Sequence, residues 1–115
     1  MILTSDVSFQ EFQNLAAQYI PTVECIPPLA YATMSLTGEA GEVAEKVKRI
    51  YRGDTAAKAI NYDDEIVKEL GDVLWCVAAI CTALNTPMEY AARVSLRKME
   101  DRRKRGLLKG SGDNR

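Results

Sequence analysis

The sequence predicts an all-α protein, an antiparallel helical bundle of about four helices that is completed by oligomerisation. Three observations support this prediction. Apolar residues recur at helical spacing along most of the chain, start and stop signals divide them into four segments, and no strand-like alternation of useful length is present. The 115 residues fit one domain, which we place at 1–106, followed by a basic and flexible tail at 107–115.

The first two predicted helices have recognisable ends. Ser8-Phe9-Gln10-Glu11 forms a capping-box pattern, and a short helix follows it as far as Pro21. After a proline-punctuated connection, residues 29–51 form one long helix that ends near Gly53. The apolar stripe of this long helix contains Leu36, Ala40, Val43, Val47 and Ile50.

The last two predicted helices are bounded in a similar way. Asn61 and the acids after it provide cap chemistry for a helix that runs to about Leu84. Thr86 is the expected cap of the final helix, and Pro87 is its expected first residue. That helix continues to about Arg105, before a glycine.

The two long helices have only short partners, so one chain would leave apolar surface uncovered. We therefore predict a homodimer or a homotetramer. Trp75 lies about 140° from Leu70 on a helical wheel, away from the main apolar stripe. It therefore needs a second surface, either a subunit contact or a nucleotide base.

Composition excludes several classes of protein. No apolar run approaches the roughly 20 residues that cross a bilayer, which argues against a membrane protein. The N-terminus lacks a secretory pattern, so we expect a cytoplasmic location. Cys76 and Cys81 lie in an apolar helix pattern, and buried thiols are expected there rather than disulfides.

Charge is distributed unevenly. Residues 1–92 carry 6 basic and 13 acidic side chains, whereas residues 93–115 carry 9 basic and 3 acidic ones. An acidic body that binds cations and a basic end that binds anions would suit a metal-chelated phosphate compound. A solvated or nucleic-acid-binding tail is the alternative.

Two short acidic motifs carry the chemistry. Glu39-Ala40-Gly41-Glu42 and Glu69-Leu70-Gly71-Asp72 each place two carboxylates three residues apart on one side of a helix. If the two helices pack side by side, Glu39, Glu42, Glu69 and Asp72 would converge and repel one another. A divalent cation removes this repulsion, and oxygen ligands favour Mg²⁺ or Mn²⁺. The alternative is surface salt bridging with Lys46, Lys48 and Lys68.

The stretch from Leu36 to Lys48, followed after a loop by Glu69-Leu70-Gly71-Asp72-Val73-Leu74-Trp75, resembles the MazG-like nucleoside triphosphate pyrophosphohydrolases. Twenty-six residues separate the two acid motifs. The closing segments 98–106 and 110–115 also resemble a group of small single-domain members.

The resemblance implies an all-α dimer or pair of dimers, with Mg²⁺ held by the four motif acids. It implies cleavage of a nucleoside triphosphate between the α and β phosphates, giving the monophosphate and pyrophosphate in nucleotide-pool house-cleaning. Base preference stays open, including deoxyuridine and deoxycytidine triphosphates, because it depends on loop and partner side chains.

Other roles are assigned by chemistry and by position. The chain has no histidine, so a protein general base must be a carboxylate, either Glu42 or Glu45. Lys98 and Arg102 correspond to basic positions that the family uses, and they are candidates for binding phosphate. Ser95 lies in a stretch where many relatives carry an asparagine, which affects the expected contact with sugar or base.

Two other functions use features of the same kind. A di-iron carboxylate bundle needs Glu-x-x-His motifs, which a chain without histidine lacks. A non-catalytic helical binding module that uses the basic C-terminal segment is the alternative from another class. Nucleic acid is not an expected partner of the enzyme.

Overall fold

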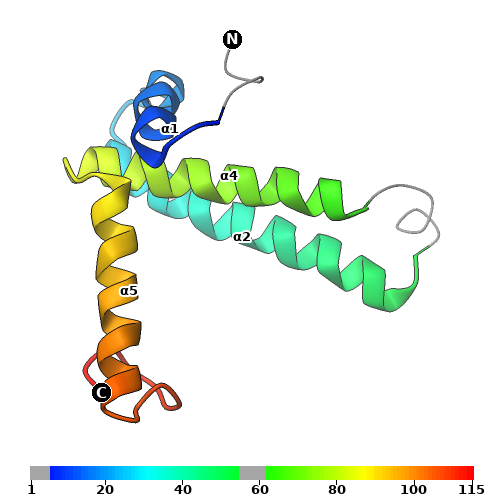
Figure 1. The fold of residues 1–115 in the computed structure, drawn as a ribbon. Coiled ribbons are helices and arrows are strands. Elements are labelled where there is room, and N and C mark those ends of the chain that lie inside the picture. The colour runs from blue at the N-terminus through cyan, green and yellow to red at the C-terminus, as the bar shows by residue number, and fades with distance from the viewer. Residues whose placement is uncertain (1–5, 55–61) are drawn as a thin grey trace.

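The computed structural model describes residues 6–54 and 62–115, and within them the chain is helical with no strand. The elements are α1 (Phe9–Ala16), a 3₁₀ turn η2 (Ala17–Tyr19), α2 (Pro28–Arg52), α4 (Tyr62–Ala83) and α5 (Met88–Lys104). Figure 1 shows α2 and α4 side by side, α1 across one end of this pair, and α5 leading away from it. The predicted all-α class is confirmed.

Local signals account for the beginnings and ends of α1 and α2. The backbone N–H of Glu11 donates to the Ser8 hydroxyl at 3.1 Å, and the backbone N–H of Ser8 donates to the Glu11 carboxylate at 2.9 Å. The predicted capping box is thus present. Pro28 opens α2, and Gly53 follows its last residue with φ of 78°, a left-handed conformation that glycine adopts without a steric penalty. The expected cap at Asn61 lies outside the described residues.

The start of α5 differs by one residue from the prediction. Pro87 is the cap residue, not the first helical one, and the Thr86 side chain does not cap the helix. The Thr86 hydroxyl instead donates to the carbonyl of Leu84 at 3.1 Å. Gln13 of α1 supplies the missing acceptor, because its Oε1 atom accepts the backbone N–H of Met88 at 2.9 Å. A side chain from a distant part of the chain therefore satisfies the helix start.

The buried core lies where α1, α4 and α5 meet. It consists of Ala16, Ala78, Cys81 and Met88, with Phe12, Trp75 and Val77 packed against it. Cys76 and Cys81 are buried free thiols, as predicted, and burial raises the pKa of each. Gln13 is buried there too, with its Nε2 atom donating to the Thr86 carbonyl. These contacts hold α1 and the start of α5 against the C-terminal half of α4.

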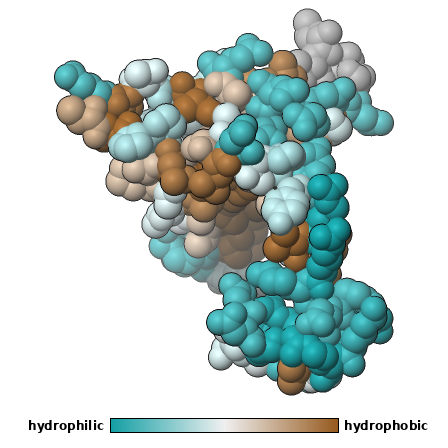
Figure 2. Space-filling view, turned by 90° about the vertical axis from the view of Figure 1, so that its left-hand side faces the viewer, coloured by the Kyte–Doolittle hydropathy of each residue, from teal (hydrophilic) through white to brown (hydrophobic). Residues whose placement is uncertain are grey.

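Much apolar surface lies outside this core. Figure 2 shows apolar side chains gathered around a shaded hollow above the hydrophilic C-terminal region. On the predicted stripe of α2, Leu36, Val43 and Val47 are partly buried, whereas Ala40 and Ile50 are exposed. Further exposed apolar side chains on α2, α4 and α5 include Met34, Val67, Leu70, Leu74, Leu96 and Met99. None of the described helices has the combined length and hydropathy that a bilayer crossing requires.

Candidate metal centre

The α2 and α4 pair brings the predicted acids together. One carboxylate oxygen from each of Glu39, Glu69 and Asp72 lies within 4.8 Å of the other two. Glu39 comes from α2, and the other two come from α4. We call these three residues the carboxylate cluster. Packing of two helices that each carry a short acidic motif produces the cluster, as the spacing predicted.

Like charges in the cluster affect its ionisation. The pKa of Glu39 is raised, first by partial burial and then by the negative charges of Asp72, Glu69 and Glu42. The negative charge of Glu42 therefore contributes to the raised pKa of Glu39. Its oxygens are nevertheless outside the group of three, and its side chain is exposed. The structure thus gathers three of the four predicted ligands and leaves the fourth beside them.

The chemistry of the cluster fits a hard divalent cation. Adjacent oxygens bound octahedrally to one Mg²⁺ at about 2.1 Å are about 3.0 Å apart, so carboxylate oxygens that lie within 4.8 Å of one another need to close by at most about 1.8 Å. Carboxylate is the ligand type that Mg²⁺ and Mn²⁺ favour, and no thiol or imidazole competes among the three. Burial is the largest cause of the raised pKa of Glu39, and the neighbouring negative charges, which such a cation would offset, add to it.

Lys46 is also part of this centre. Its Nζ atom lies 3.1 Å from Oε1 of Glu69 and 3.4 Å from Oε2 of Glu65. These bonds raise the pKa of Lys46, the Glu69 contact being the largest cause. Sequence reasoning considered this lysine only as a salt-bridge alternative to metal binding. Its position seven residues, or two turns, after Glu39 was the signal that could have placed it in the site.

Glu45 lies in a different environment. Its carboxylate is 2.7 Å from Nζ of Lys48 and 3.7 Å from Nε of Arg49, both on α2. The hydrogen bond from Lys48 is the main reason that the pKa of Glu45 is lowered. Glu45 is outside the carboxylate cluster. Of the two predicted candidates for the general base, only Glu42 influences the charge of the cluster.

Trp75 contacts another part of the same chain. Its indole Nε1 atom donates to the backbone carbonyl of Ala16 at 3.3 Å, and its ring packs against the core. The ring is only partly buried, so a subunit contact or a base contact at Trp75 stays a prediction. A small apolar cavity of about 200 Å³ lies beside it, lined by Trp75 and by residues of the N-terminal segment.

Lys98 and Arg102 are brought together by the C-terminal tail. Oδ1 of Asp113 lies 3.2 Å from Nζ of Lys98 and 3.3 Å from Nη2 of Arg102. Arg102 is buried, and it also donates to the backbone carbonyls of Gly112 and Asp113. The pair therefore already contacts an anion, a role for Asp113 that the sequence analysis missed.

The larger cavity lies elsewhere. It has a volume of about 360 Å³ and is lined by residues of α1 and of the turn between α4 and α5, among them Gln13 and Asn85. None of the clustered acids lines it. The carboxylate cluster combines like charge with partial burial of Glu39 and Glu69, a combination that is common at functional sites.

Comparison with known proteins agrees with this geometry. The family model of the MazG nucleotide pyrophosphohydrolase domain matches residues 30–107, a stretch that contains all four motif acids. The chain belongs to this family. It is also similar to the Gene 37 protein of Mycobacterium phage L5, with 41% identity over 92 residues that cover 80% of this chain and 81% of that protein. No solved structure matches.

Membership in the MazG family confirms the resemblance seen in the motifs. It supports a nucleotide as substrate and a metal ion as cofactor, in agreement with the carboxylate cluster. The match also extends over α5, so the helix that carries Lys98 and Arg102 is part of the domain. The printed name of the phage relative describes no activity.

Proposed function

We propose that this MazG-family protein hydrolyses nucleoside triphosphates, including deoxynucleotides, between the α and β phosphates. The products are the nucleoside monophosphate and pyrophosphate, and the role is nucleotide-pool house-cleaning. The observation that carries the proposal is the convergence of Glu39, Glu69 and Asp72 from two helices of the matched domain. The proposed cofactor is Mg²⁺, with Mn²⁺ as a substitute.

The three clustered acids are the proposed metal ligands, and Glu42 is the proposed fourth. When bound, a divalent cation supplies charge neutralisation for the phosphates and makes a water molecule more acidic. The helix pair holds the carboxylates at mid-length, where both helices are regular. Positioning therefore depends on packing between α2 and α4 rather than on a loop.

Glu42 is the proposed general base. It is exposed beside the cluster and contributes to its negative charge, so it can accept a proton from water near the phosphate. Glu45 is the second candidate, but Lys48 and Arg49 engage its carboxylate and its lowered pKa makes it a weaker base. The electrostatics thus favour Glu42.

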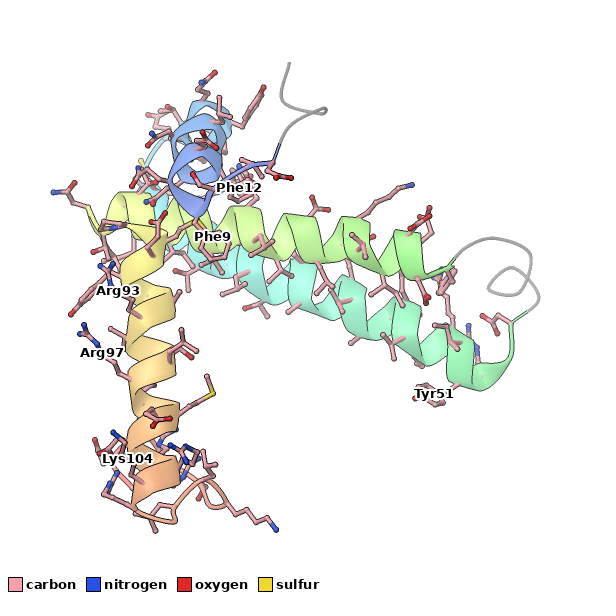
Figure 3. The ribbon with its side chains drawn as sticks, viewed as in Figure 1. Phe9, Phe12, Tyr51, Arg93, Arg97 and Lys104 are labelled. Carbon is pink, nitrogen blue, oxygen red and sulfur yellow. The ribbon has the colours of Figure 1, made fainter. Side chains whose placement is uncertain are left out.

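Lys98 and Arg102 are the proposed phosphate-binding pair. Their contact with the Asp113 carboxylate supports this role, because it places two cations around one anionic oxygen. In this proposal a phosphate group replaces Asp113 when the substrate binds. Arg93 and Arg97 project from α5 on the side away from α2 and α4 in Figure 3, and we assign them no role in the site.

The proposed assembly is a homodimer or homotetramer. The exposed apolar side chains of α2 and α4 support it, because surface of this kind is costly to leave in water. Figure 2 places apolar side chains around a hollow that a single chain leaves open. Sedimentation analysis over a range of protein concentrations would measure the oligomeric state.

A nucleotide panel tests the proposed reaction. The protein is incubated with the four dNTPs, the four NTPs and dUTP in Mg²⁺, with and without EDTA, and all phosphate-containing products are separated. We expect monophosphate and pyrophosphate, lost on addition of EDTA, and the fastest nucleotide identifies the preferred base. If a folded, metal-loaded protein cleaves no nucleotide, the proposal fails and the binding-module alternative is favoured.

A further inference from the structure

Lys46 forms an ion pair unlike the others in the described chain. Its side chain is 19% exposed and that of Glu69 is 16% exposed, so both partners are more than four-fifths buried. Every other ion pair among residues 6–54 and 62–115 has at least one partner that is more exposed than this. A partly buried ion pair loses hydration, and this loss calls for compensation from its surroundings.

The compensation lies in the charge of the cluster. Glu39, Glu69 and Asp72 bring three carboxylates together, and Lys46 is the cation in contact with one of them. The ammonium group bridges from α2 to α4, the two helices that carry these acids. Lys46 therefore offsets part of the repulsion that opposes packing of this helix pair when no metal ion is bound.

The same contact conflicts with metal binding. A divalent cation and the Lys46 ammonium group would both bind the carboxylate of Glu69, and the two positive charges repel each other. The structure provides a second anchor for the lysine. Glu65, one turn before Glu69, lies 3.4 Å from Lys46 Nζ and is also held by Lys68 at 2.8 Å. Lys46 can thus leave Glu69 and keep an acidic partner.

We infer that Lys46 is the resident counter-cation of the carboxylate cluster, and that it gives up Glu69 to Mg²⁺ or Mn²⁺ and thereby sets a low affinity for free metal. This inference rests on the proposed metal site. Lys46 is a positioning residue in this account, because it acts through Glu69. A weak affinity for free metal favours binding of metal together with a triphosphate, whose negative charge offsets the lysine.

The test compares Lys46→Met with Lys48→Met. Both substitutions remove one positive charge from α2, but Lys48 contacts Glu45, which is outside the cluster. Mn²⁺ is titrated into each protein at fixed ionic strength, and the free Mn²⁺ is followed by electron paramagnetic resonance. We expect Lys46→Met to bind Mn²⁺ about ten-fold more tightly than wild type, and Lys48→Met to stay within about two-fold.

Other results would overturn the inference in distinguishable ways. Weaker or unchanged Mn²⁺ binding by Lys46→Met would show that the lysine does not compete with the metal. An equal gain in Mn²⁺ affinity in Lys48→Met would show that the effect comes from the overall charge of the protein and not from contact with Glu69. If wild type and both variants bind no Mn²⁺, the proposed metal site itself is wrong.

Thermal unfolding provides a second readout. In EDTA, Lys46→Met should melt at a lower temperature than wild type, because the carboxylates lose their counter-cation. Saturating Mn²⁺ should raise its melting temperature by more than it raises that of wild type. If Lys46→Met does not fold, Lys46→Gln removes the same charge while retaining a polar group, and the same two measurements apply. If Mn²⁺ raised the melting temperatures of wild type and of the Lys46 variants equally, the inference would be contradicted.

Discussion

The α2 and α4 pair and the C-terminal region distribute charge in opposite ways. Between α2 and α4, three carboxylates converge and one lysine reaches them. In α5 and the tail, basic side chains outnumber acidic ones, and pairs such as Arg103 with Glu100 and Arg105 with Asp101 form within one turn of helix. The first arrangement gathers like charges that repel one another, whereas in the second Glu100 and Asp101 are each paired with a basic side chain nearby on the same helix.

This difference separates function from stability. Exposed pairs three or four residues apart contribute a few tenths of a kcal/mol each and require no ligand. A partly buried group of like charges does not stabilise the fold in this way, and its presence indicates a ligand of opposite charge. The charge count of −1 for the whole chain hides this contrast between its two ends.

Removal of a clustered carboxylate should have the largest effect on activity. Glu69→Gln deletes a proposed metal ligand, and we expect Mg²⁺-dependent turnover to fall by at least about a hundred-fold. Glu100→Gln is the matched control, because that glutamate forms only exposed pairs on α5. Its turnover should remain within about two-fold of wild type. The rate of pyrophosphate release measures turnover in both variants. Equal losses of turnover would show that the carboxylate cluster is no more important for activity than the exposed acids of α5.

Glu42→Gln tests the residue beside the cluster. The substitution should leave helical content by circular dichroism unchanged and should reduce turnover by about a hundred-fold or more, since it removes a ligand and the proposed base. Glu45→Gln is the comparison, and we expect a much smaller loss because Glu45 is held by Lys48 and Arg49. A full rate for Glu42→Gln would show that its assignment is wrong.

Gln13 offers a test of stability rather than of catalysis. Gln13→Ala leaves the backbone N–H of Met88 and the carbonyl of Thr86 without their partner, which should cost about 1–3 kcal/mol in the free energy of unfolding. Gln10→Ala, on the same helix but exposed, loses only a bond to Asn14 and should change stability much less. Urea unfolding measures the difference. Equal losses in the two variants would contradict the capping role.

The tail contact predicts a moderate kinetic effect. Asp113→Asn frees Lys98 and Arg102 from their carboxylate partner, so we expect KM for the triphosphate to fall several-fold with little change in kcat. Asp101→Asn changes the charge of the C-terminal region equally but breaks only the pair with Arg105. An equal fall in KM in this control would assign the effect to general charge.

The smallest expected effect is the pH dependence of stability without metal. Because the pKa of Glu39 is raised in the folded state, the folded protein holds that proton more tightly than the unfolded chain does. The associated stability is present below the unfolded pKa and is lost as pH rises through the folded one. In EDTA, the melting temperature of wild type should fall as pH rises between the unfolded-state and the folded-state pKa of Glu39, and that of Glu39→Gln should not. Mg²⁺ should suppress it, because metal binding favours the ionised carboxylate.

Features encoded by local sequence were predictable. The capping box of Ser8 and Glu11, the proline at the start of α2 and Gly53 at its end act within a few residues of one another. The acid motifs also obey a local rule, because residues three apart on packed helices share a side. That rule predicted the convergence of four carboxylates, of which Glu39, Glu69 and Asp72 meet and Glu42 does not.

Features that depend on distant contacts were not predictable. The start of α5 shifted by one residue because Gln13, 75 positions earlier, provides the acceptor. Trp75 packs against the core and donates to Ala16 of α1, a contact that its position on a helical wheel cannot reveal. The same limit applies to Asp113, whose partners Lys98 and Arg102 lie on α5 and are reached only because the tail turns back.

The position of bond cleavage tests the central claim most directly. The best nucleotide from the panel is hydrolysed in ¹⁸O-enriched water with Mg²⁺, and the products are resolved by ³¹P nuclear magnetic resonance. The account predicts nucleoside monophosphate and pyrophosphate, with no turnover when EDTA removes the metal. Nucleoside diphosphate with inorganic phosphate, or hydrolysis that continues in EDTA, would contradict the assignment of the carboxylate cluster as the metal centre of a pyrophosphohydrolase.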